Sequence, residues 1–310
     1  MNEGDSLINP RMTRSSYVAI ENLGVDDAND KFFRNVANVK VGIWKVVLLT
    51  VSMLLTCAFV IYMLLPNPGM PAIKPKMLLN HSRIIVIGDV HGNLEPFDRL
   101  LRVLDMRDDD TLVLAGDLVT KGPDSIGVLK RAKEVGALCI RGNHDNKVIQ
   151  WRKLLAKYGE QDIQKIKLPP GLDWKTEHYK LASTLPEDLF QYLEGCSIIL
   201  SIPRFSMYVV HAGINPFLSI EQQKSKEVMN MRSIVSHKPT KKKQVGKPWW
   251  DVWNAQQVTL QHPKTVVYGH EASSGLNIQE YTIGLDTGCA RGRKLSAMTF
   301  PEHTLVQVKC

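Results

Sequence analysis

Five segments of the chain place acidic, amide and imidazole side chains next to glycine, and such side chains bind divalent metals. In chain order they are residues 88–92 (GDVHG), 116–122 (GDLVTKG), 142–145 (GNHD), 211–213 (HAG) and 269–271 (GHE). Oxygen and nitrogen ligands without a thiolate suit zinc, manganese, iron or cobalt and do not choose among them. Two ions about 3.5–4 Å apart, sharing a carboxylate, can activate water against a phosphate ester or anhydride. The segments therefore predict a dinuclear hydrolase.

Six side chains are the candidate metal ligands: Asp89, His91, Asp117, Asn143, His211 and His270. Asp117 suits the shared carboxylate because it ends the middle strand of a predicted three-strand motif. Asp89 and His91 are two residues apart, so both can leave one strand end toward one ion. Each motif alone would be weak, and the prediction depends on their joint order after successive strands. Asp286 is interpreted as a turn residue, since the ligand set is complete without it.

The elements that must position these side chains alternate between strand and helix. Apolar runs at 83–88, 111–115 and 137–140 predict strands, and helical periodicity follows each of them at 96–104, 126–135 and 148–158. This β-α-β-α-β order predicts a mainly parallel sheet covered by helices. Ligands bind at the carboxyl ends of such strands, which is where the first three motifs fall.

Six later strand-like segments predict a second, mostly antiparallel sheet: 198–202, 206–210, 265–268, 281–285, 295–300 and 304–308. The fold class is therefore α/β, with two sheets flanked by helices. The polar, basic and aromatic segment 221–253 is predicted to be an inserted loop or cap. Its tryptophans, Trp249, Trp250 and Trp253, are expected to pack that cap rather than stack on nucleic-acid bases.

An uncharged apolar run at 46–65 has the length of a membrane-spanning helix. It divides the chain into a disordered cytosolic tail (1–45), a signal-anchor (46–65), a proline-rich stalk (66–80) and a catalytic domain (81–310). More basic residues precede the span than follow it, and the single Asn-x-Ser/Thr sequon, at Asn80, follows it. Both features favour a type II topology with a luminal catalytic domain.

The formal net charge of +8 lies entirely after residue 65. A basic domain attracts polyanions. Within it, the run Lys238, Lys241, Lys242, Lys243 and Lys247 is either a guide for an extended polyanion or a solvated loop. No sequence-specific nucleic-acid partner is expected. The five cysteines show no regular spacing, so they are expected to be free thiols.

The motifs resemble the calcineurin-like metallophosphoesterase superfamily, and within it the phosphoprotein-phosphatase branch. Its GDxHG, GDxxxRG and GNH[ED] signatures match in order, together with 209–216 (VVHAGINP) and 267–270 (VYGH), and the resemblance covers 83–310. The runs 122–125 (GPDS) and 285–289 (LDTGC) are similar to the bacterial symmetrical diadenosine-tetraphosphatase group. With a membrane anchor, the chain is most similar to fungal vacuolar zinc-dependent endopolyphosphatases.

The resemblance implies a two-sheet β-sandwich flanked by helices and a role for each site residue. Asp89, His91, Asp117 and His270 would hold one divalent ion, and Asp117, Asn143 and His211 would hold the other. Zinc is favoured, with manganese, cobalt, iron or magnesium as alternatives. His144 would be the general acid, and phosphate oxygens would be bound by Lys121, Arg141 and Arg232.

Two residues depart from the branch pattern, which has Asp-Arg-Gly where this chain has Thr120-Lys121-Gly122. Thr120 cannot supply the carboxylate that orients the catalytic histidine, and Asp145 is the alternative candidate for that role. Lys121 keeps the positive charge but cannot form the bidentate hydrogen bonds to phosphate that arginine forms. Both changes weaken the prediction of a phosphoserine substrate and leave the metal site intact.

The function expected from these observations is hydrolysis of phosphoanhydride bonds within inorganic polyphosphate by a dinuclear-metal-bound hydroxide, in a vacuole-like lumen. The alternatives are a serine/threonine phosphoprotein phosphatase, a dinucleoside-polyphosphate hydrolase or a non-catalytic polyanion-binding adaptor. Lys31, Lys40 and Lys45 in the tail could accept ubiquitin for sorting into the vacuole, a hypothesis taken from the resemblance.

Overall fold

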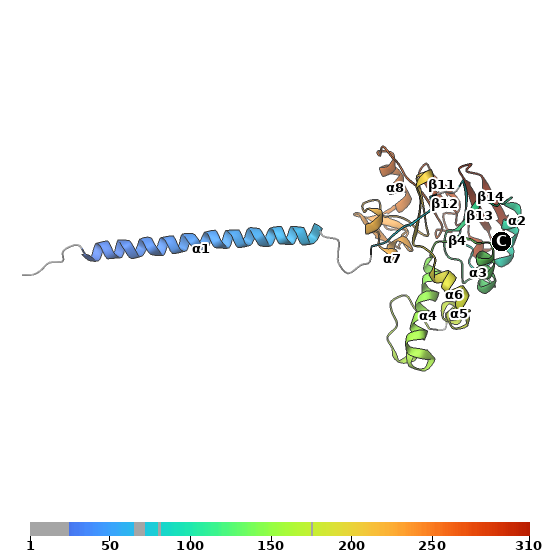
Figure 1. The fold of residues 1–310 in the computed structure, drawn as a ribbon, viewed down its shortest axis with the longest axis horizontal. Helices are drawn as coiled ribbons and strands as arrows, with labels where there is room; N and C mark the ends of the chain where they lie inside the picture. The colour runs from blue at the N-terminus through green and yellow to red at the C-terminus, as the bar shows by residue number, and fades with distance from the viewer. Residues whose placement is uncertain (1–24, 65–71, 80–81, 175) are drawn as a thin grey trace, which may run out of the picture. The chain divides into compact units, whose positions relative to one another are not determined.

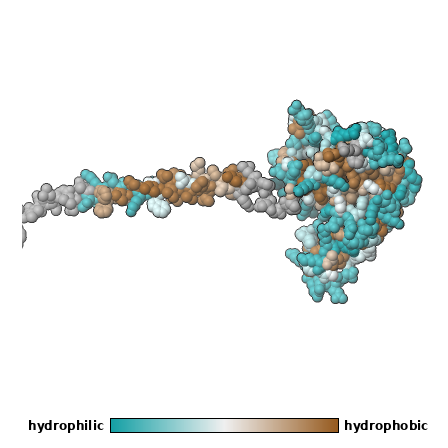
Figure 2. Space-filling model, in the orientation of Figure 1, coloured by the Kyte–Doolittle hydropathy of each residue, from teal (hydrophilic) through white to brown (hydrophobic). Residues whose placement is uncertain are grey.

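The computed structural model describes residues 25–64, 72–79, 82–174 and 176–310. The chain divides into two units, Met1–Pro68 and Gly69–Cys310. In the first unit, helix α1 (Val25–Leu64) contains the segment Asn29–Ile61, which is long and apolar enough to cross a membrane. Figure 2 shows the apolar residues along this helix.

The prediction of a disordered tail over 1–45 is wrong for its described part, because residues 25–45 belong to α1. An apolar helix that is already formed lowers the barrier to adding further turns at its end. Asp30 and Arg34, one turn apart, form an ion pair at 2.7 Å that supports such an extension. The remainder of the predicted tail, residues 1–24, lies outside the described residues.

The first sheet of the second unit has five strands in the order β14-β13-β2-β3-β4. Their bounds are β2 (Arg83–Ile87), β3 (Asp110–Leu114), β4 (Leu138–Cys139), β13 (Lys294–Phe300) and β14 (Leu305–Lys309). The three strands β2, β3 and β4 are parallel, and helices α2 (Leu94–Val103) and α3 (Ser125–Glu134) connect them. This arrangement confirms the predicted β-α-β-α-β order.

The second sheet has six strands in the order β1-β5-β6-β10-β12-β11. Their bounds are β1 (Lys76–Met77), β5 (Ile199–Ile202), β6 (Met207–Val210), β10 (Thr265–Tyr268), β11 (Asn277–Ile278) and β12 (Thr282–Gly284). It is a mixed sheet, because β1 pairs with β5, and β6 and β12 pair with β10, in parallel. The prediction of a mostly antiparallel sheet is therefore wrong.

Two further sequence predictions fail at the edges of these sheets. The segments near 295–300 and 304–308 join the first sheet, where β13 runs antiparallel to β2. Part of the predicted stalk is strand β1, whose neighbours Ile73 and Leu78 are buried in the domain. Long-range strand pairing is decided by burial against distant partners, which local sequence patterns do not reveal.

Alternating side chains of the central strands build the layers of the fold. In β2, Ile85 and Ile87 face the helices, whereas Ile84 and Val86 face the second sheet. This period of two is the geometry of a strand buried on both faces. The apolar side chains of Met207 and Val209 from β6 close the layer between the sheets. The result is the predicted two-sheet sandwich flanked by helices.

Helices α4 (Asn143–Asp162), α5 (Glu177–Thr184) and α6 (Glu187–Glu194) lie together at one end of the domain (Figure 1). The sequence places the start of the first of these at 148, whereas the helix begins at Asn143, directly after Gly142. This early start brings the GNHD motif into the first turn of α4. Three-residue 3-10 helices occur at Ile163–Lys165, Pro203–Phe205, Ile220–Gln222 and Cys289–Arg291.

The predicted cap is a folded subdomain on the outer face of the second sheet. It contains α7 (Ser225–Val228), α8 (Trp249–Gln257) and a three-stranded sheet formed by β7 (Ser233–Val235), β8 (Lys238–Thr240) and β9 (Lys247–Pro248). Trp249, Trp250 and Trp253 are buried against Tyr268 and other apolar side chains of that face. The packing interpretation of the tryptophans is therefore confirmed.

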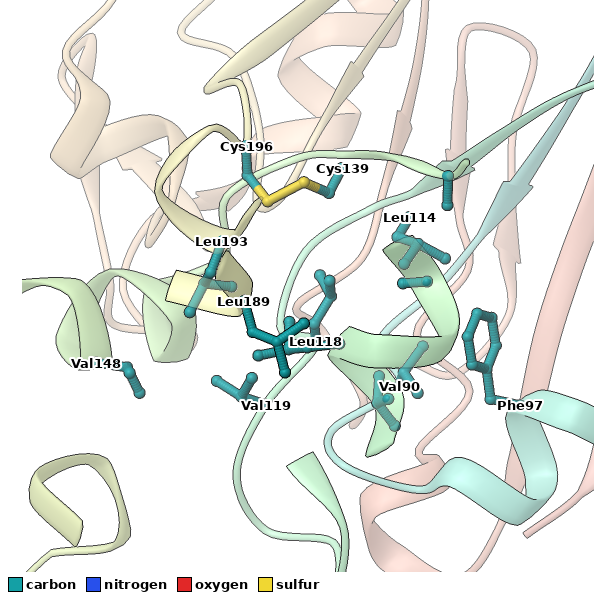
Figure 3. Close-up of a cluster of buried hydrophobic side chains, with 14 of the residues drawn as sticks. Val90, Phe97, Leu114, Leu118, Val119, Cys139, Val148, Leu189, Leu193 and Cys196 are labelled. Carbon is teal, nitrogen blue, oxygen red and sulfur yellow. A yellow bond between two sulfur atoms is a disulfide. The ribbon is translucent and has the colours of Figure 1, made fainter. Parts of the chain in front are cut away.

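Four of the five cysteines form disulfides, so the prediction of free thiols is wrong for them. Cys139 in β4 is bonded to Cys196 after α6 (Figure 3), with Cα atoms 4.8 Å apart. Cys289 is bonded to Cys310, with Cα atoms 5.2 Å apart. The partners are separated by 57 and 21 residues. Folding alone brings them together, since no spacing motif marks them.

Candidate active site

The five predicted motifs converge at the carboxyl ends of strands from both sheets. Asp89 and His91 follow β2, and Asp117 follows β3. His211 follows β6 and His270 follows β10, two neighbouring parallel strands of the second sheet. The carboxylates of Asp89 and Asp117 and the ring of His211 are almost completely buried. The structure thus brings the sequence-predicted residues together at one place.

Two groups of these residues could each hold a metal ion, and they share Asp117. The first group is Asp89, His91 and Asp117, in which His91 Nε2 lies 3.7 Å from Asp89 Oδ2 and 3.4 Å from Asp117 Oδ2. The second group is Asp117, His211 and His270. A carboxylate common to two ligand groups is what a dinuclear centre requires.

The grouping differs from the sequence expectation at His270. The resemblance implies that His270 joins Asp89 and His91, whereas its ring lies against His211, with centroids 5.0 Å apart. The cause is the parallel pairing of β6 with β10, which places the two strand ends side by side. Asn143 stands with this second group, because its Oδ1 lies 3.1 Å from His211 Nε2.

Backbone carbonyls orient two of the candidate histidine ligands. His91 Nδ1 lies 3.2 Å from the carbonyl oxygen of Val119, and His211 Nδ1 lies 3.0 Å from that of Ala115. An N–H donated to such a carbonyl leaves the lone pair on Nε2, the nitrogen that faces Asp117 in both residues. Metal-binding histidines in proteins show this arrangement.

The charges and unpaired atoms of the site fit bound cations. Burial, reinforced by the nearby carboxylates of Asp286 and Asp117, raises the pKa of Asp89 well above its ordinary value. Among the described residues, Asp89 Oδ2 and His270 Nε2 are buried polar atoms without a hydrogen-bond partner. Buried carboxylates and orphaned ligand atoms are unfavourable unless a cation pairs with them. The donor set therefore suits divalent metals.

The backbone around the ligands shows two unusual features: positive φ angles at three candidate ligands, and close approaches that only glycine allows. His91, Asp117 and His270 have positive φ angles of 51°, 51° and 68°. Such conformations are costly for residues other than glycine and concentrate at functional sites. A Cβ on Gly142 would lie 2.2 Å from the backbone nitrogen of Asp117, and one on Gly269 would lie 2.0 Å from Asp89 Oδ1. Only glycine permits the chain to approach both carboxylates so closely.

His144, the predicted general acid, lies beside the two ligand groups. Its backbone N–H donates to Asp117 Oδ1 at 2.8 Å, and its ring lies 5.0 Å from the ring of His91. Its Nδ1 is 2.8 Å from Thr120 Oγ1 and 3.0 Å from His178 Nε2. Burial lowers the pKa of His144 to about 3, and Lys121 adds to this effect against the opposing charge of Asp117.

Asp145 does not orient His144, so the alternative suggested from sequence is wrong. Its carboxylate is completely buried and accepts backbone N–H groups of Leu118, Val119 and Gly142 at 2.9, 3.3 and 2.8 Å. Asp145 therefore fixes the loop after β3 to the first turn of α4. The Asp145 carboxylate accepts hydrogen bonds from backbone N–H groups and not from the ring of His144.

A cavity of about 140 Å³ opens beside His91 and His270 and is rich in charged side chains. Lys121, Arg232 and Arg291 line it, together with Glu271 and Asp286. Lys121 Nζ lies 2.8 Å from His91 Nε2, and Arg232 forms an ion pair with Glu271. Two of the three predicted phosphate-binding residues thus lie at the site.

Arg141, the third, is not among the described residues that line this cavity. Its guanidinium donates to the backbone carbonyl of Glu194 at the end of α6. Asp286 fulfils its predicted turn role by accepting the backbone N–H of Gly288 at 3.0 Å, and it also reaches the cavity wall. Arg291 and His178 were not foreseen, because neither belongs to a motif. The alternation of strands and helices gave no signal for them.

The fold and the site define a known class of enzyme. Residues 82–293 match the family model described as calcineurin-like phosphoesterase, so the chain belongs to this family. It is therefore a metallophosphohydrolase with a dinuclear centre, as the ligand groups around Asp117 also indicate. The predicted family, fold and enzyme class are confirmed.

Individual relatives of the chain act on phosphoanhydrides. It is 27% identical to the zinc-dependent endopolyphosphatase of Saccharomyces cerevisiae, over 79% of this chain and 88% of the relative. It is 29% identical to an asymmetrical bis(5'-nucleosyl)-tetraphosphatase of Oceanobacillus iheyensis, over 73% of this chain and 92% of the relative. The crystal structure of a candidate diadenosine tetraphosphatase matches with a TM-score of 0.63 at 33% identity, over 76% of this chain and 98% of that one.

Proposed function

We propose that this chain is an endopolyphosphatase, which cuts phosphoanhydride bonds inside inorganic polyphosphate. The observation that carries the proposal is the cavity beside His91 and His270, which three cationic side chains line. A chain of phosphates bears charge on both sides of the bond that is cut, so it needs cations beyond the two metals. Lys121, Arg232 and Arg291 supply such charges. The zinc-dependent endopolyphosphatase among the relatives agrees with this substrate.

In the proposed mechanism, Asp89, His91 and Asp117 would hold one divalent ion, and Asp117, Asn143, His211 and His270 would hold the other. When bound, two such ions would neutralise phosphate charge and bring the pKa of the attacking water toward neutrality. Lys121 and Arg232 bind phosphate oxygens as negative charge builds up on them. His144 gives the Nε2 proton of its doubly protonated form to the leaving oxygen, while its Nδ1 is engaged by Thr120 and His178. Its low pKa makes this form a strong acid and a minor species at neutral pH.

A basic rim next to the cavity supports an extended substrate. Lys243 Nζ donates to Ser273 Oγ at 2.7 Å and lies 3.4 Å from Glu271, the carboxylate that also pairs with Arg232. These contacts connect the lysine-rich segment after β8 with the wall of the cavity. The guide hypothesis from sequence therefore gains support, because at least one lysine of the run reaches the site.

The two disulfides support a luminal catalytic domain. Disulfides persist in oxidising compartments and are rare in the cytosol. Because all four bonded cysteines follow α1 in the sequence, we propose a single-pass type II topology with the domain in a vacuole-like lumen. The ubiquitin acceptors Lys31, Lys40 and Lys45 lie on α1 and remain a hypothesis. The sequon at Asn80 lies outside the described residues.

The test uses the full chain purified in detergent and polyphosphate of a single long length, resolved on a gel. An endopolyphosphatase gives intermediate lengths early in the reaction, with little free phosphate. Asp117→Asn is the inactive control, and exhaustive chelation must abolish the activity of the wild-type chain. Release of phosphate without intermediate lengths, or an unaltered polyphosphate band, would overturn the proposal.

Hydrolysis of dinucleoside polyphosphates is the second candidate, favoured by the relative from Oceanobacillus iheyensis. Such a substrate also contains phosphoanhydrides but adds two nucleobases. The tryptophans of the cap cannot stack on them, because Trp249, Trp250 and Trp253 are 1%, 7% and 6% exposed. A higher kcat/KM on diadenosine tetraphosphate than on polyphosphate, with the same preparation, would favour this candidate.

A further inference from the structure

Helix α5 reaches the active site although it belongs to none of the five motifs. Its first residue, Glu177, accepts the backbone N–H of Lys121 at 2.8 Å through Oε2. Lys121 follows Thr120, the residue that replaces the expected aspartate. The start of α5 therefore contacts the one part of the site that departs from the family pattern.

The backbone of Thr120 and Lys121 needs this support. Their φ angles are 68° and 69°, and a positive φ is a marked outlier for a β-branched residue such as threonine. Strained conformations of this kind persist only where surrounding contacts determine them. Here Ser125 Oγ accepts the N–H of Thr120 at 2.8 Å, and Glu177 accepts the next one. The side chain of Thr120 is thereby held against His144.

The next residue of α5 contacts His144 directly. His178 Nε2 lies 3.0 Å from His144 Nδ1, and the ring centroids are 4.9 Å apart with an interplanar angle of 32°. Thr120 Oγ1 lies at 2.8 Å from the same Nδ1. The hydroxyl of Thr120 and the imidazole of His178 thus contact His144 Nδ1. In the family pattern a carboxylate contacts this nitrogen. A neutral imidazole accepts a hydrogen bond through its unprotonated nitrogen.

Packing of α5 does not require a histidine at this position. The neighbouring Tyr179 stacks edge-on against Trp151, with centroids 5.1 Å apart, and Leu181 and Ala182 are buried in the core. These side chains attach the helix to α4, whereas His178 points its nitrogen at another histidine. A role in catalysis therefore explains the residue better than a role in packing.

We propose that His178 is a positioning residue that accepts the Nδ1–H of His144 and, with Thr120, replaces the missing carboxylate. The proposal rests on the proposed role of His144 as general acid. In this step His144 starts as the imidazolium, protonated on both ring nitrogens. It gives the Nε2 proton to the leaving oxygen and becomes the neutral Nδ1–H tautomer, which still donates to His178. His178 thus selects the tautomer and orientation of His144 without itself losing or gaining a proton.

The test compares leaving groups, since a positioning residue of the acid matters most when the leaving oxygen needs a proton. His178→Ala and His178→Gln are assayed in the full chain on phenyl phosphate, a poor leaving group, and 4-nitrophenyl phosphate, a good one. We expect His178→Ala to lower kcat about tenfold or more on the first and about threefold at most on the second. His178→Gln, whose amide oxygen can accept the same hydrogen bond, should recover most of this loss.

Two further variants serve as controls for the role of His178. His262→Ala, an exposed histidine away from the site, should leave both rates unchanged. In a double-mutant cycle, His178→Ala should add almost no further loss to His144→Ala. Equal losses on both esters, or no recovery with glutamine, would overturn the role of His178. Absence of polyphosphate cleavage by a wild-type chain that still hydrolyses both esters would instead overturn the proposed function alone.

Discussion

The backbone N–H of His144 donates to Asp117 Oδ1 at 2.8 Å, so the residue proposed as the acid is tied to the carboxylate shared by both metal groups. This bond exists because α4 begins at Asn143, directly behind the loop that follows β3. Displacement of Asp117 would therefore disturb metal binding and acid catalysis together.

Asp117→Asn should abolish most activity while the fold is kept. The amide oxygen can still accept the N–H of His144, but the neutral side chain is a poor bridge between two cations. Mutation of residues that only hydrogen-bond to metal ligands typically lowers metal affinity or activity about 10–100-fold. For the shared ligand itself we expect activity to fall at least about 100-fold. Metal content by elemental analysis and circular dichroism should show fewer ions in a folded protein. Full metal occupancy with normal activity would contradict the bridging role.

His144→Ala should lower the rate unequally among substrates. General acid catalysis contributes roughly 10²–10⁴-fold where the leaving group needs a proton. An alkyl or aryl phosphate should therefore lose far more activity than polyphosphate, whose leaving group is already stable as an anion. Initial rates on matched concentrations of both substrates provide the measurement. A uniform loss would mean that His144 acts on binding or on the metals instead.

Replacing the bonded cysteines in pairs by serine should destabilise the domain according to the length of the loop that each disulfide closes. The sequence separation of 57 from Cys139 to Cys196 corresponds to about 4 kcal/mol of unfolding free energy in the chain-entropy model. The sequence separation of 21 from Cys289 to Cys310 corresponds to about 3 kcal/mol. Urea unfolding of each pair variant measures both values. A thiol assay on the denatured wild-type chain should detect only Cys57.

Acidification should destabilise the domain partly through His178. Burial, with Lys147 as the next cause, lowers the pKa of His178 from 6.5 to about 4. The unfolded chain therefore takes up a proton at a higher pH than the folded chain does. The stabilisation from neutral His178 is complete above pH 6.5 and is lost as the pH falls toward 4.

Urea unfolding at pH 7 and pH 5 measures this effect, with His178→Gln as the comparison. The unfolding free energy should fall less on acidification in the glutamine variant, which has no group to protonate there. Lys147, Asp117, Glu177 and Lys121 also influence the charge of His178, and His144 contacts it at 3.0 Å. All of them remain in both proteins, so the difference reports the removal of the imidazole and its effect on His144. An equal fall in both would show that other groups set the acid sensitivity.

The sequence indicates that the candidate metal ligands lie close together, because their positions follow from local rules. Asp89, Asp117 and Asn143 come directly after three parallel strands, and the ends of such strands necessarily meet at one edge. The helices between them were equally visible from apolar periodicity. The grouping of His270 with His211 has no such local rule, since it depends on how β6 and β10 pair.

The features that the sequence does not predict all depend on distant partners. His178 meets His144 across 34 residues, and the cysteine pairs meet across 57 and 21. The pairing of β13 with β2 likewise joins the C-terminal part of the chain to the beginning of the domain. No propensity or spacing records such contacts, because burial in the folded domain creates them.

Strand β1 also determines where the second unit can be separated from helix α1. Lys76 and Met77 pair with Leu200 and Ser201 of β5, and Ile73 and Leu78 are buried in two different apolar clusters of the domain. A fragment that starts at residue 81 would leave the N–H and C=O groups of β5 open to other chains. Exposed strands of this kind promote aggregation. Soluble expression therefore calls for a fragment that omits α1 and still includes Ile73 and β1.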